Sequence, residues 1–206
     1  MLRGLWMSSW PINFLLRMRV AVYPGSFDPL HIGHQAILEY LTGPGGFDCT
    51  YLIVSPQNPF KDPSKALNAR RRYEAACEAV ARHPELRVKV DDIELGMDPP
   101  NYTIRTLDAL KAREPGNEFV LVMGADNIAG LPRWRCFRRL ISEFSIVVYP
   151  RPGYDAPALL ADLLALCRRR HLRCPVTLIN APLVDISSTE LRRALSEGRD
   201  ITPWLM

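Results

Sequence analysis

Short apolar runs alternate along the chain with amphipathic segments. Runs bounded by turn residues lie at 20–22, 51–54, 119–123, 145–149 and 176–179, and residues 86–90 alternate between apolar and polar. Such runs are typical of strands in a parallel sheet. The segments between them have apolar residues at helical spacing and predict helices that begin near residues 31, 68, 102, 155 and 187. This alternation predicts an α/β fold, with three layers built around a doubly wound parallel sheet.

Size and composition set the broad class of protein. The chain has 206 residues, of which 48% are hydrophobic and 23% are charged, and it fits one globular domain with a sizeable core. We expect that domain to span residues 18–206 and residues 1–17 to be a non-catalytic extension. The net charge of +4 suits an anionic substrate, although it would suit many other partners as well. No apolar run approaches the ~20 residues of a membrane span, so we expect no membrane partner.

The five cysteines are scattered and include no Cys-x-x-Cys pair. This usage favours free thiols in a reducing compartment, and therefore a cytoplasmic protein. Cys167, His171 and Cys174 could be imagined as metal ligands, but a helix end with unrelated thiols is the better interpretation. We expect no metal site in the protein. The basic run 168–173 is interpreted as a solvated helix end rather than a nucleic-acid surface.

The first strand leads into a turn that is suited to an anion. Gly25 lets the backbone approach a bulky group, and a helix beginning near His31 offers free N–H groups and a partial positive charge. His31 and His34 are three residues apart and share one face of that helix, while Gly33 removes a side chain between them. An imidazole pair here suits phosphate oxygens, or the charge that builds on them in a transition state. Two unrelated surface histidines are the alternative, which the combination of strand, glycines and histidines disfavours.

Polar residues also follow other strands, at the edge where open α/β sheets bind ligands. Lys61 lies in a loop after the second strand and is either solvated or a phosphate ligand. Asp126 follows Gly124 and could cap a helix or accept hydrogen bonds from a ribose. Trp134 lies in a turn and is either a core residue or a stacking platform. We expect several other charged residues to be mainly solvated, namely Arg70, Arg71, Arg72, Asp91, Asp92 and Glu94.

A second polar turn lies near the end of the chain, in the run Asp-Ile-Ser-Ser-Thr-Glu-Leu-Arg-Arg at 185–193. Ser187 and Glu190 have the spacing of a capping box, and Gly198 supplies a helix stop. An ordinary well-capped helix is the alternative interpretation. Hydroxyl groups and Arg192 around a helix N-terminus favour a second phosphate-binding turn. A doubly wound sheet can bring both turns to one crevice.

The motifs carry a resemblance to known proteins. Gly-Ser-Phe-Asp-Pro at 25–29, followed by His-Ile-Gly-His at 31–34, resembles the signature of the nucleotidyltransferase superfamily with the His-x-Gly-His motif. From about residue 19 to about residue 202 the chain resembles the bacterial nicotinate mononucleotide adenylyltransferases. The further matching motifs are SPQNPFK at 55–61, YTIRTL at 102–107, GAD at 124–126, PRW at 132–134, RPGY at 151–154 and ISSTELR at 186–192. The resemblance implies the Rossmann-like nucleotidyltransferase fold.

The resemblance also implies a reaction. AMP would pass from ATP to nicotinate mononucleotide, giving nicotinate adenine dinucleotide and pyrophosphate in NAD biosynthesis. Mg²⁺ would travel with the ATP phosphates and have no dedicated protein ligands, and no nucleic acid would take part. The implied catalytic residues are His31, His34, Lys61 and Arg192. The implied ATP-binding residues are Gly25, Ser26, Phe27, His31, His34, Gly124, Asp126, Arg151, Ile186, Ser187, Ser188, Thr189 and Arg192. The implied mononucleotide-binding residues are Ser26, Lys61, Thr103 and Trp134.

The chain departs from the family pattern at three places, and other functions stay open. Tyr-Pro-Gly-Ser at 23–26 is closer to the phosphopantetheine branch, Phe60 stands where the family often has His, and the chain ends at Met206, short of the family's usual terminal segment. The alternatives are a phosphopantetheine adenylyltransferase, a synthetase-like domain acting with tRNA, and a nucleotide-binding sensor without turnover. The sequence decides neither between nicotinate and nicotinamide mononucleotide nor between a monomer and a homodimer.

Overall fold

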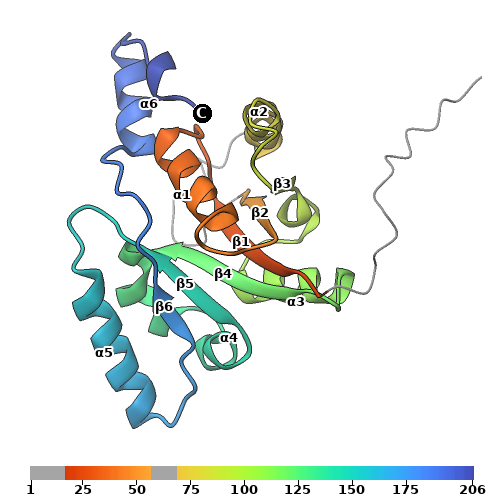
Figure 1. Cartoon of the computed structure of the whole chain (residues 1–206), viewed down its shortest axis with the longest axis vertical. Coiled ribbons are helices and arrows are strands. Elements are labelled where there is room, and N and C mark those ends of the chain that lie inside the picture. Colours follow the sequence, from red (N-terminus) through yellow and green to blue (C-terminus); the bar gives the residue numbers. More distant parts are fainter. Residues whose placement is uncertain (1–16, 57–68) are drawn as a thin grey trace, which may run out of the picture.

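The computed structural model of the protein describes residues 17–56 and 69–206. In this part of the chain a single sheet of parallel strands runs through the centre (Figure 1). Its strands are β1 (Arg19–Gly25), β2 (Cys49–Val54), β3 (Val88–Asp91), β4 (Glu118–Gly124), β5 (Ser145–Tyr149) and β6 (Val176–Leu178). Their order is β3-β2-β1-β4-β5-β6, so the direction of winding reverses between β1 and β4. This confirms the predicted doubly wound sheet and places its switch point at the carboxyl ends of β1 and β4.

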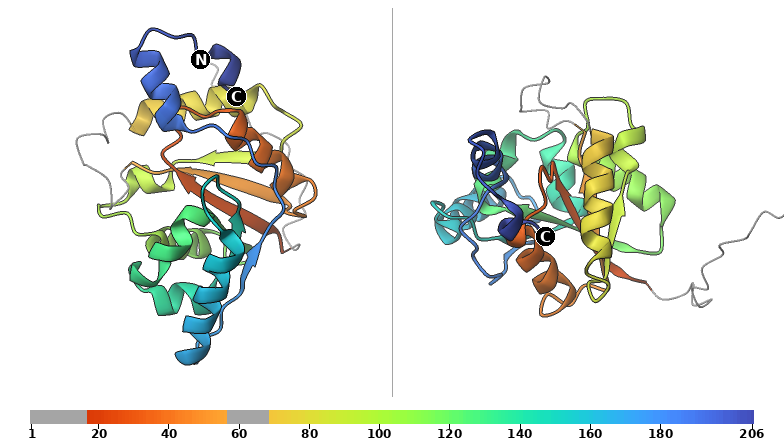
Figure 2. Two further views of the ribbon diagram at one scale, coloured as in Figure 1. Left: turned by 90° about the vertical axis from the view of Figure 1, so that its left-hand side faces the viewer. Right: turned by 90° about the horizontal axis from the view of Figure 1, so that it is seen from above.

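Helices cover both faces of the sheet, as the two views of Figure 2 show. They are α1 (Ile32–Thr42), α2 (Ala69–Ala81), α3 (Thr103–Arg113), α4 (Phe137–Glu143), α5 (Ala156–Arg169) and α6 (Ser188–Ser196). Shorter 3-10 turns are η2 (Ile93–Gly96), η3 (Ala125–Arg133) and η4 (Thr202–Trp204). The sequence pattern did not predict α4, because seven residues are too few to establish a helical period.

Successive residues of the central strands pack into different cores. On β4, Phe119, Leu121 and Met123 face the core that contains α3, α4 and α5. Val120 and Val122 face the opposite core, which contains α1 and α2. Because β4 is covered on both sides, its sequence is a continuous apolar run rather than an alternation. Packing on both faces thus fixes the position of β4, and with it the position of the polar residues that follow the strand.

Three charged side chains that we expected to be solvated are buried instead, namely Arg72, Asp91 and Glu94. Arg72 lies on the buried stripe of α2 with Ala76 and Ala79, and donates hydrogen bonds to backbone carbonyls after β1 and β2. Asp91 forms an ion pair with Arg113 at 2.6 Å. The charges of Arg72 and Asp91 are tolerated in the interior because polar groups distant in sequence meet them there.

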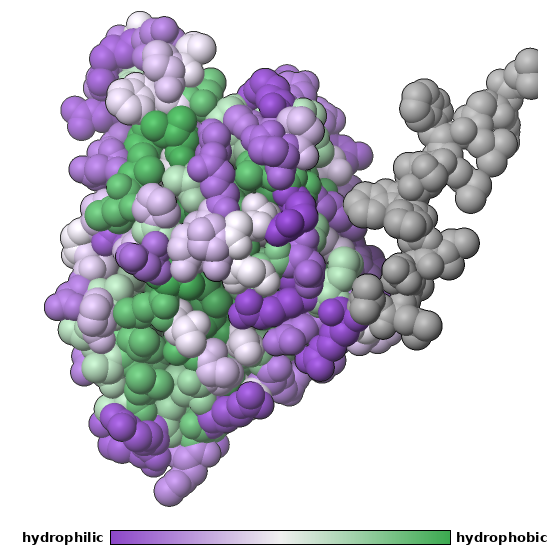
Figure 3. All heavy atoms as spheres, viewed as in Figure 1, coloured by the Kyte–Doolittle hydropathy of each residue, from purple (hydrophilic) through white to green (hydrophobic). Residues whose placement is uncertain are grey.

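The surface and the thiols add two further observations. Figure 3 shows mostly polar side chains on one face, with apolar residues gathered over β6 and alongside α1. Within the described ranges, every helix is too short or too polar to cross a membrane.

All five cysteines are free thiols. The predicted extension at residues 1–17 falls almost wholly outside the described residues, and stays a prediction.

Candidate active site

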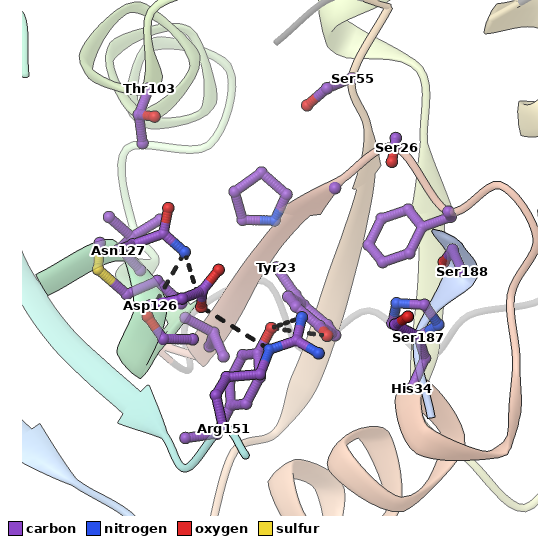
Figure 4. A pocket seen from close by; sticks show the side chains of 18 of the residues that line it. Tyr23, Ser26, His34, Ser55, Thr103, Asp126, Asn127, Arg151, Ser187 and Ser188 are labelled. Atoms are coloured by element: carbon purple, nitrogen blue, oxygen red, sulfur yellow. Dashed lines mark hydrogen bonds and ion pairs between the residues drawn. The ribbon is translucent and has the colours of Figure 1, made fainter. Parts of the chain in front are cut away.

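A cleft of about 420 Å³ opens at the carboxyl ends of the strands, over the switch point of the sheet. Segments from the whole length of the described chain line it, and Figure 4 shows how they face one another. His34 lies beside Ser187 and Ser188 on one side, while Ser55 and Thr103 lie on the other. The cleft therefore has two distinct ends joined by the end of β1.

The paired histidines lie at the start of α1 and hold each other in place. Their imidazole rings have centroids 3.8 Å apart and are tilted by 35°. Nδ1 of His31 accepts a hydrogen bond from the Gly33 N–H at 3.2 Å, and Nδ1 of His34 accepts one from the His31 N–H at 3.3 Å. The two side chains thus form a reciprocal cap on the first turn of the helix. Both rings are buried and still line the cleft.

Burial and charge keep both histidines neutral. Burial, with the nearby Arg151 cation, lowers the pKa of His31 to about 4. Burial, His31 and Arg151 hold the pKa of His34 well below the ordinary value for an imidazole. A neutral imidazole whose Nδ1 accepts a hydrogen bond carries its proton on Nε2. Each ring can therefore offer one Nε2–H donor to an oxygen atom in the cleft.

The glycine between the histidines is required by close packing. A Cβ at Gly33 would lie 3.0 Å from His31 Nδ1 and 3.0 Å from Ile186 Cγ2. To relieve these contacts, the imidazole of His31 and the side chain of Ile186 would have to shift by a few tenths of an ångström. Glycine at this position therefore lets the two phosphate-binding turns that the sequence predicts pack closely against each other.

Those two turns are joined directly. The Ser188 hydroxyl donates a hydrogen bond to the carbonyl of Pro29 at 3.2 Å, and the Arg192 guanidinium donates one to the carbonyl of Asp28 at 2.6 Å. Arg192 also donates to the Thr189 hydroxyl at 3.0 Å. The N-terminus of α6 is thereby held beside the N-terminus of α1, so that both helix ends and one guanidinium face the same cleft.

A cluster around Arg151 forms the floor next to the histidines. Arg151 donates a hydrogen bond to the Tyr149 hydroxyl at 3.1 Å, and Nε of Arg151 lies 3.7 Å from a carboxylate oxygen of Asp126. The Tyr149 hydroxyl in turn lies 3.3 Å from the Tyr23 hydroxyl. Burial raises the pKa of both tyrosines, so they remain neutral hydrogen-bonding groups. Asp126 is exposed and has oxygen atoms available to a ligand.

The far end of the cleft is built around the first turn of α3. The residue before this helix, Tyr102, provides no side-chain cap, which leaves N–H groups of the first turn for a ligand. Thr103 and the half-buried Trp134 line the cleft beside it. The buried Glu94 lines the same end and accepts a hydrogen bond from the Thr106 hydroxyl at 2.6 Å.

Nearly all residues that the sequence singled out lie in this cleft, with two exceptions. Ile186 lines a smaller hollow next to it, with His31, His34 and Arg151. Lys61 lies outside the described residues, as does Phe60. The lining residues among those singled out are Gly25, Ser26, Phe27, His31, His34, Thr103, Gly124, Asp126, Trp134, Arg151, Ser187, Ser188, Thr189 and Arg192.

Several lining residues were missed by sequence reasoning. Tyr23 and Tyr149 read as strand residues, and only their place at the carboxyl ends of β1 and β5 could have indicated the cleft. Glu94 follows β3 in the same way, but it was interpreted as part of a solvated acidic loop. Among the described residues, no three His, Cys, Asp or Glu side chains cluster so as to hold a metal ion.

Comparison with known proteins adds the family. A family model described as cytidylyltransferase-like matches residues 22–194. A "probable nicotinate-nucleotide adenylyltransferase" of Bacteroides fragilis is 35% identical over 191 residues, which cover 93% of this chain and 89% of the relative. A relative of the same description from Porphyromonas gingivalis is 36% identical over 190 residues, covering 91% and 89% of the two chains.

Among solved structures, a nicotinic acid mononucleotide adenylyltransferase of Plasmodium falciparum, complexed with NaAD, has a similar fold. Its TM-score is 0.72 at 19% identity, covering 92% of this chain and 91% of that chain. This structural similarity shows the fold, and the two bacterial relatives show the family. The chain belongs to the cytidylyltransferase-like family and, within it, to the nicotinate-nucleotide adenylyltransferases.

Proposed function

We propose that the protein transfers the adenylyl group of ATP to nicotinate mononucleotide, giving nicotinate adenine dinucleotide and pyrophosphate. The observation that carries this proposal is the single cleft in which two helix N-termini, two imidazoles and Arg192 converge at one end, while an uncapped helix and Trp134 lie at the other. Such a cleft suits a triphosphate at the first end and a flat, acid-bearing ring at the second. The names of the close relatives point to the same reaction.

The phosphate end would act by position and charge. The acceptor phosphate attacks the α-phosphorus of ATP, the bond to the leaving pyrophosphate breaks, and no covalent enzyme intermediate forms. His31 and His34 would donate Nε2–H hydrogen bonds to phosphate oxygens as negative charge moves to the leaving group. Arg192 would hold the same phosphates, and the hydroxyls of Ser187, Ser188 and Thr189 would assist it. By resemblance, Lys61 would be a further phosphate ligand.

Neutral imidazoles suit this role better than cationic ones. A donor that keeps its proton binds the developing charge without a change of protonation state during turnover. The closely packed rings support the same arrangement, because two imidazolium cations with centroids 3.8 Å apart would repel each other. We therefore assign both histidines to charge stabilisation rather than to proton transfer.

The two nucleotides would use different walls of the cleft. Adenosine would lie against Gly124, Asp126 and Arg151, with backbone from Gly25 to Phe27 and with Ile186 nearby. Asp126 is exposed and can accept hydrogen bonds from a ribose. The pyridine ring would stack on Trp134, and its carboxylate would accept N–H hydrogen bonds at the start of α3 near Thr103. Ser26 lies between the two sites and would contact the mononucleotide.

Mg²⁺ would enter with ATP. When bound to the phosphate oxygens, it would neutralise part of their charge and favour departure of pyrophosphate. The donor groups in the cleft fit this arrangement, because imidazole, guanidinium and hydroxyl groups recognise phosphate, whereas Mg²⁺ prefers oxygen anions. We further propose a cytoplasmic protein that acts without nucleic acid or membrane, as a monomer or a homodimer.

One assay tests the proposed function. The purified protein is given ATP, Mg²⁺ and one acceptor at a time: nicotinate mononucleotide, nicotinamide mononucleotide or phosphopantetheine. Pyrophosphate release is followed, and the product is identified by chromatography and mass. We expect the dinucleotide from nicotinate mononucleotide. Turnover only with phosphopantetheine would favour that branch, and binding of ATP without turnover on any acceptor would indicate a nucleotide sensor.

A further inference from the structure

Glu94 is a buried acid with half of its carboxyl group left without a partner. Its side chain comes from η2, directly after β3, and only 3% of the residue is exposed. Oε1 accepts the hydrogen bond from Thr106, whereas the buried Oε2 has no hydrogen-bond partner among the described residues. Nor does any Lys, Arg or His of residues 17–56 and 69–206 form an ion pair with it.

The other buried acid on the same edge of the sheet shows what is unusual about Glu94. Asp91 lies three residues earlier and pairs with both Arg113 and Lys89, at 2.6 and 3.3 Å. Those two cations lower the pKa of Asp91 despite its burial. Burial raises the pKa of Glu94. The hydroxyl groups of Thr106 and Ser55 favour its charged form, but no cation among the described residues offsets the loss of water around that charge. Glu94 therefore lacks a positive partner in the part of the chain that the structure describes.

The position of Glu94 indicates where such a partner would come from. Its side chain lines the cleft with Ser55, Asn101 and Thr103, at the end assigned above to the mononucleotide. The N-ribosylated pyridine ring of that substrate carries a formal positive charge. A cation that binds beside a buried carboxylate interacts with it more strongly than with an exposed one, because less water surrounds the buried group and screens the pair.

We propose that Glu94 supplies the counter-charge for the pyridinium ring of the mononucleotide, and that this protein thereby selects the oxidised, cationic form of the ring. This inference rests on the proposed function and adds to it a residue that recognises the charge of the substrate. The burial of Oε2 favours attraction through the cleft wall over a direct hydrogen bond to a ribose hydroxyl, which Oε2 could form only after the side chain moves.

The test compares two ring forms that differ in charge. Binding of nicotinate mononucleotide and of its chemically reduced dihydropyridine form, whose ring is uncharged, is measured by calorimetry for wild type, Glu94→Gln and Asp92→Asn. Gln keeps an oxygen that can accept the hydrogen bond from Thr106. Asp92→Asn is the matched control, since it removes a carboxylate from the same loop at an exposed position that does not line the cleft.

We expect the wild type to bind the oxidised form more tightly than the reduced form. Glu94→Gln should weaken binding of the oxidised form by about 10- to 100-fold and change binding of the reduced form by less than about 2-fold. Glu94→Asp, which retains the charge, should retain the preference for the oxidised ring, and Asp92→Asn should bind like the wild type. An equal loss for both ring forms in the Gln variant would mean a hydroxyl contact or a structural role, and would overturn the proposal.

Two further measurements keep the outcome clear. A wild-type protein that binds both ring forms equally overturns the proposal even if the Gln variant fails to fold, which its thermal unfolding midpoint would reveal. The proposed function is judged separately, by turnover of the wild type with nicotinate mononucleotide. Normal turnover without any preference for the charged ring would remove the role of Glu94 and leave the reaction standing.

Discussion

Arg192 donates a hydrogen bond to the backbone carbonyl of Asp28 at 2.6 Å, although the two residues are 164 positions apart. The side chain of Arg192 is 44% exposed, and it also lies 3.9 Å from the Asp28 carboxylate. This contact holds the N-terminus of α6 beside the N-terminus of α1, so that the two helix ends share one cleft. Neither sequence motif would form this cleft alone. A phosphate in the cleft would compete with Asp28 for the same guanidinium.

We predict that Arg192→Gln lowers kcat/KM for adenylyl transfer by roughly 10²-fold or more, because the leaving phosphates lose a cationic donor. Arg192→Lys should restore only part of the rate, since an ammonium cannot reproduce the paired N–H donors of the guanidinium. The measurement is steady-state release of pyrophosphate. Arg193→Gln is the control, because Arg193 is more exposed and pairs with Glu197. A rate in the Gln variant equal to the control would exclude Arg192 from the phosphate site.

His34→Ala should reduce kcat by about 10²-fold or more, which is the scale for removal of one charge-stabilising donor. His34→Asn is a stricter variant, because Asn can accept the His31 N–H hydrogen bond and so keep the helix cap while the Nε2 donor is lost. Single-turnover rates with saturating ATP and mononucleotide separate this loss from weakened binding. His83→Ala, outside the cleft, should retain the wild-type rate. Full activity in the Asn variant would leave His34 with a purely structural role.

The free energy of unfolding should depend on pH through His31 and His34. The pKa of His31 in the folded protein is about 4, below the ordinary value of 6.5, so the unfolded chain takes up protons first as the pH falls. The stabilisation that neutral His31 contributes is complete above about pH 6.5 and is lost as the pH falls towards 4. For His31 alone the full loss is on the order of 3 kcal/mol. Urea unfolding at pH 7.5 and pH 4.5 measures it, and His31→Gln should show the smaller decrease. Equal decreases in both proteins would mean that His31 is protonated in the fold.

The alternating pattern along the chain was sufficient to predict the sheet, because strands covered on both faces leave long apolar runs such as that around Val120 and Val122. The motif residues were found for a related reason: Gly33, His31 and Arg192 belong to the first turns of helices, whose residue preferences are local. The contact of Arg192 with Asp28, 164 positions away, could not be read from those preferences. The partners of buried charges could not be predicted in this way. Arg72 meets carbonyls 17 and 46 residues away, and such contacts leave no periodic signal.

Trp134 gives a prediction that separates the two substrates. Trp134→Ala should raise KM for the mononucleotide by roughly 10-fold and leave KM for ATP nearly unchanged, because only the pyridine ring loses its stacking partner. Trp134→Phe should lie between the Ala variant and the wild type. Steady-state kinetics with each substrate varied in turn provide the two constants. Trp204→Ala, at a half-exposed position outside the cleft, is the control. Equal increases in both KM values would place Trp134 in the core instead.

Arg72 holds the ends of two strands together and should affect stability and geometry at once. Its guanidinium donates hydrogen bonds to the carbonyl of Ser26 after β1 and to the carbonyls of Ser55 and Pro56 after β2. Arg72→Met leaves these acceptors without donors and should lower the free energy of unfolding by about 2–4 kcal/mol. Arg72→Lys should recover part of it. Arg71→Met, at the exposed neighbouring position, is the control, and urea unfolding measures all three variants. Because Arg72 holds Ser26 through this contact, the Met variant should also raise KM for the mononucleotide. An unchanged free energy of unfolding together with an unchanged KM would show that the strand ends hold their positions without Arg72.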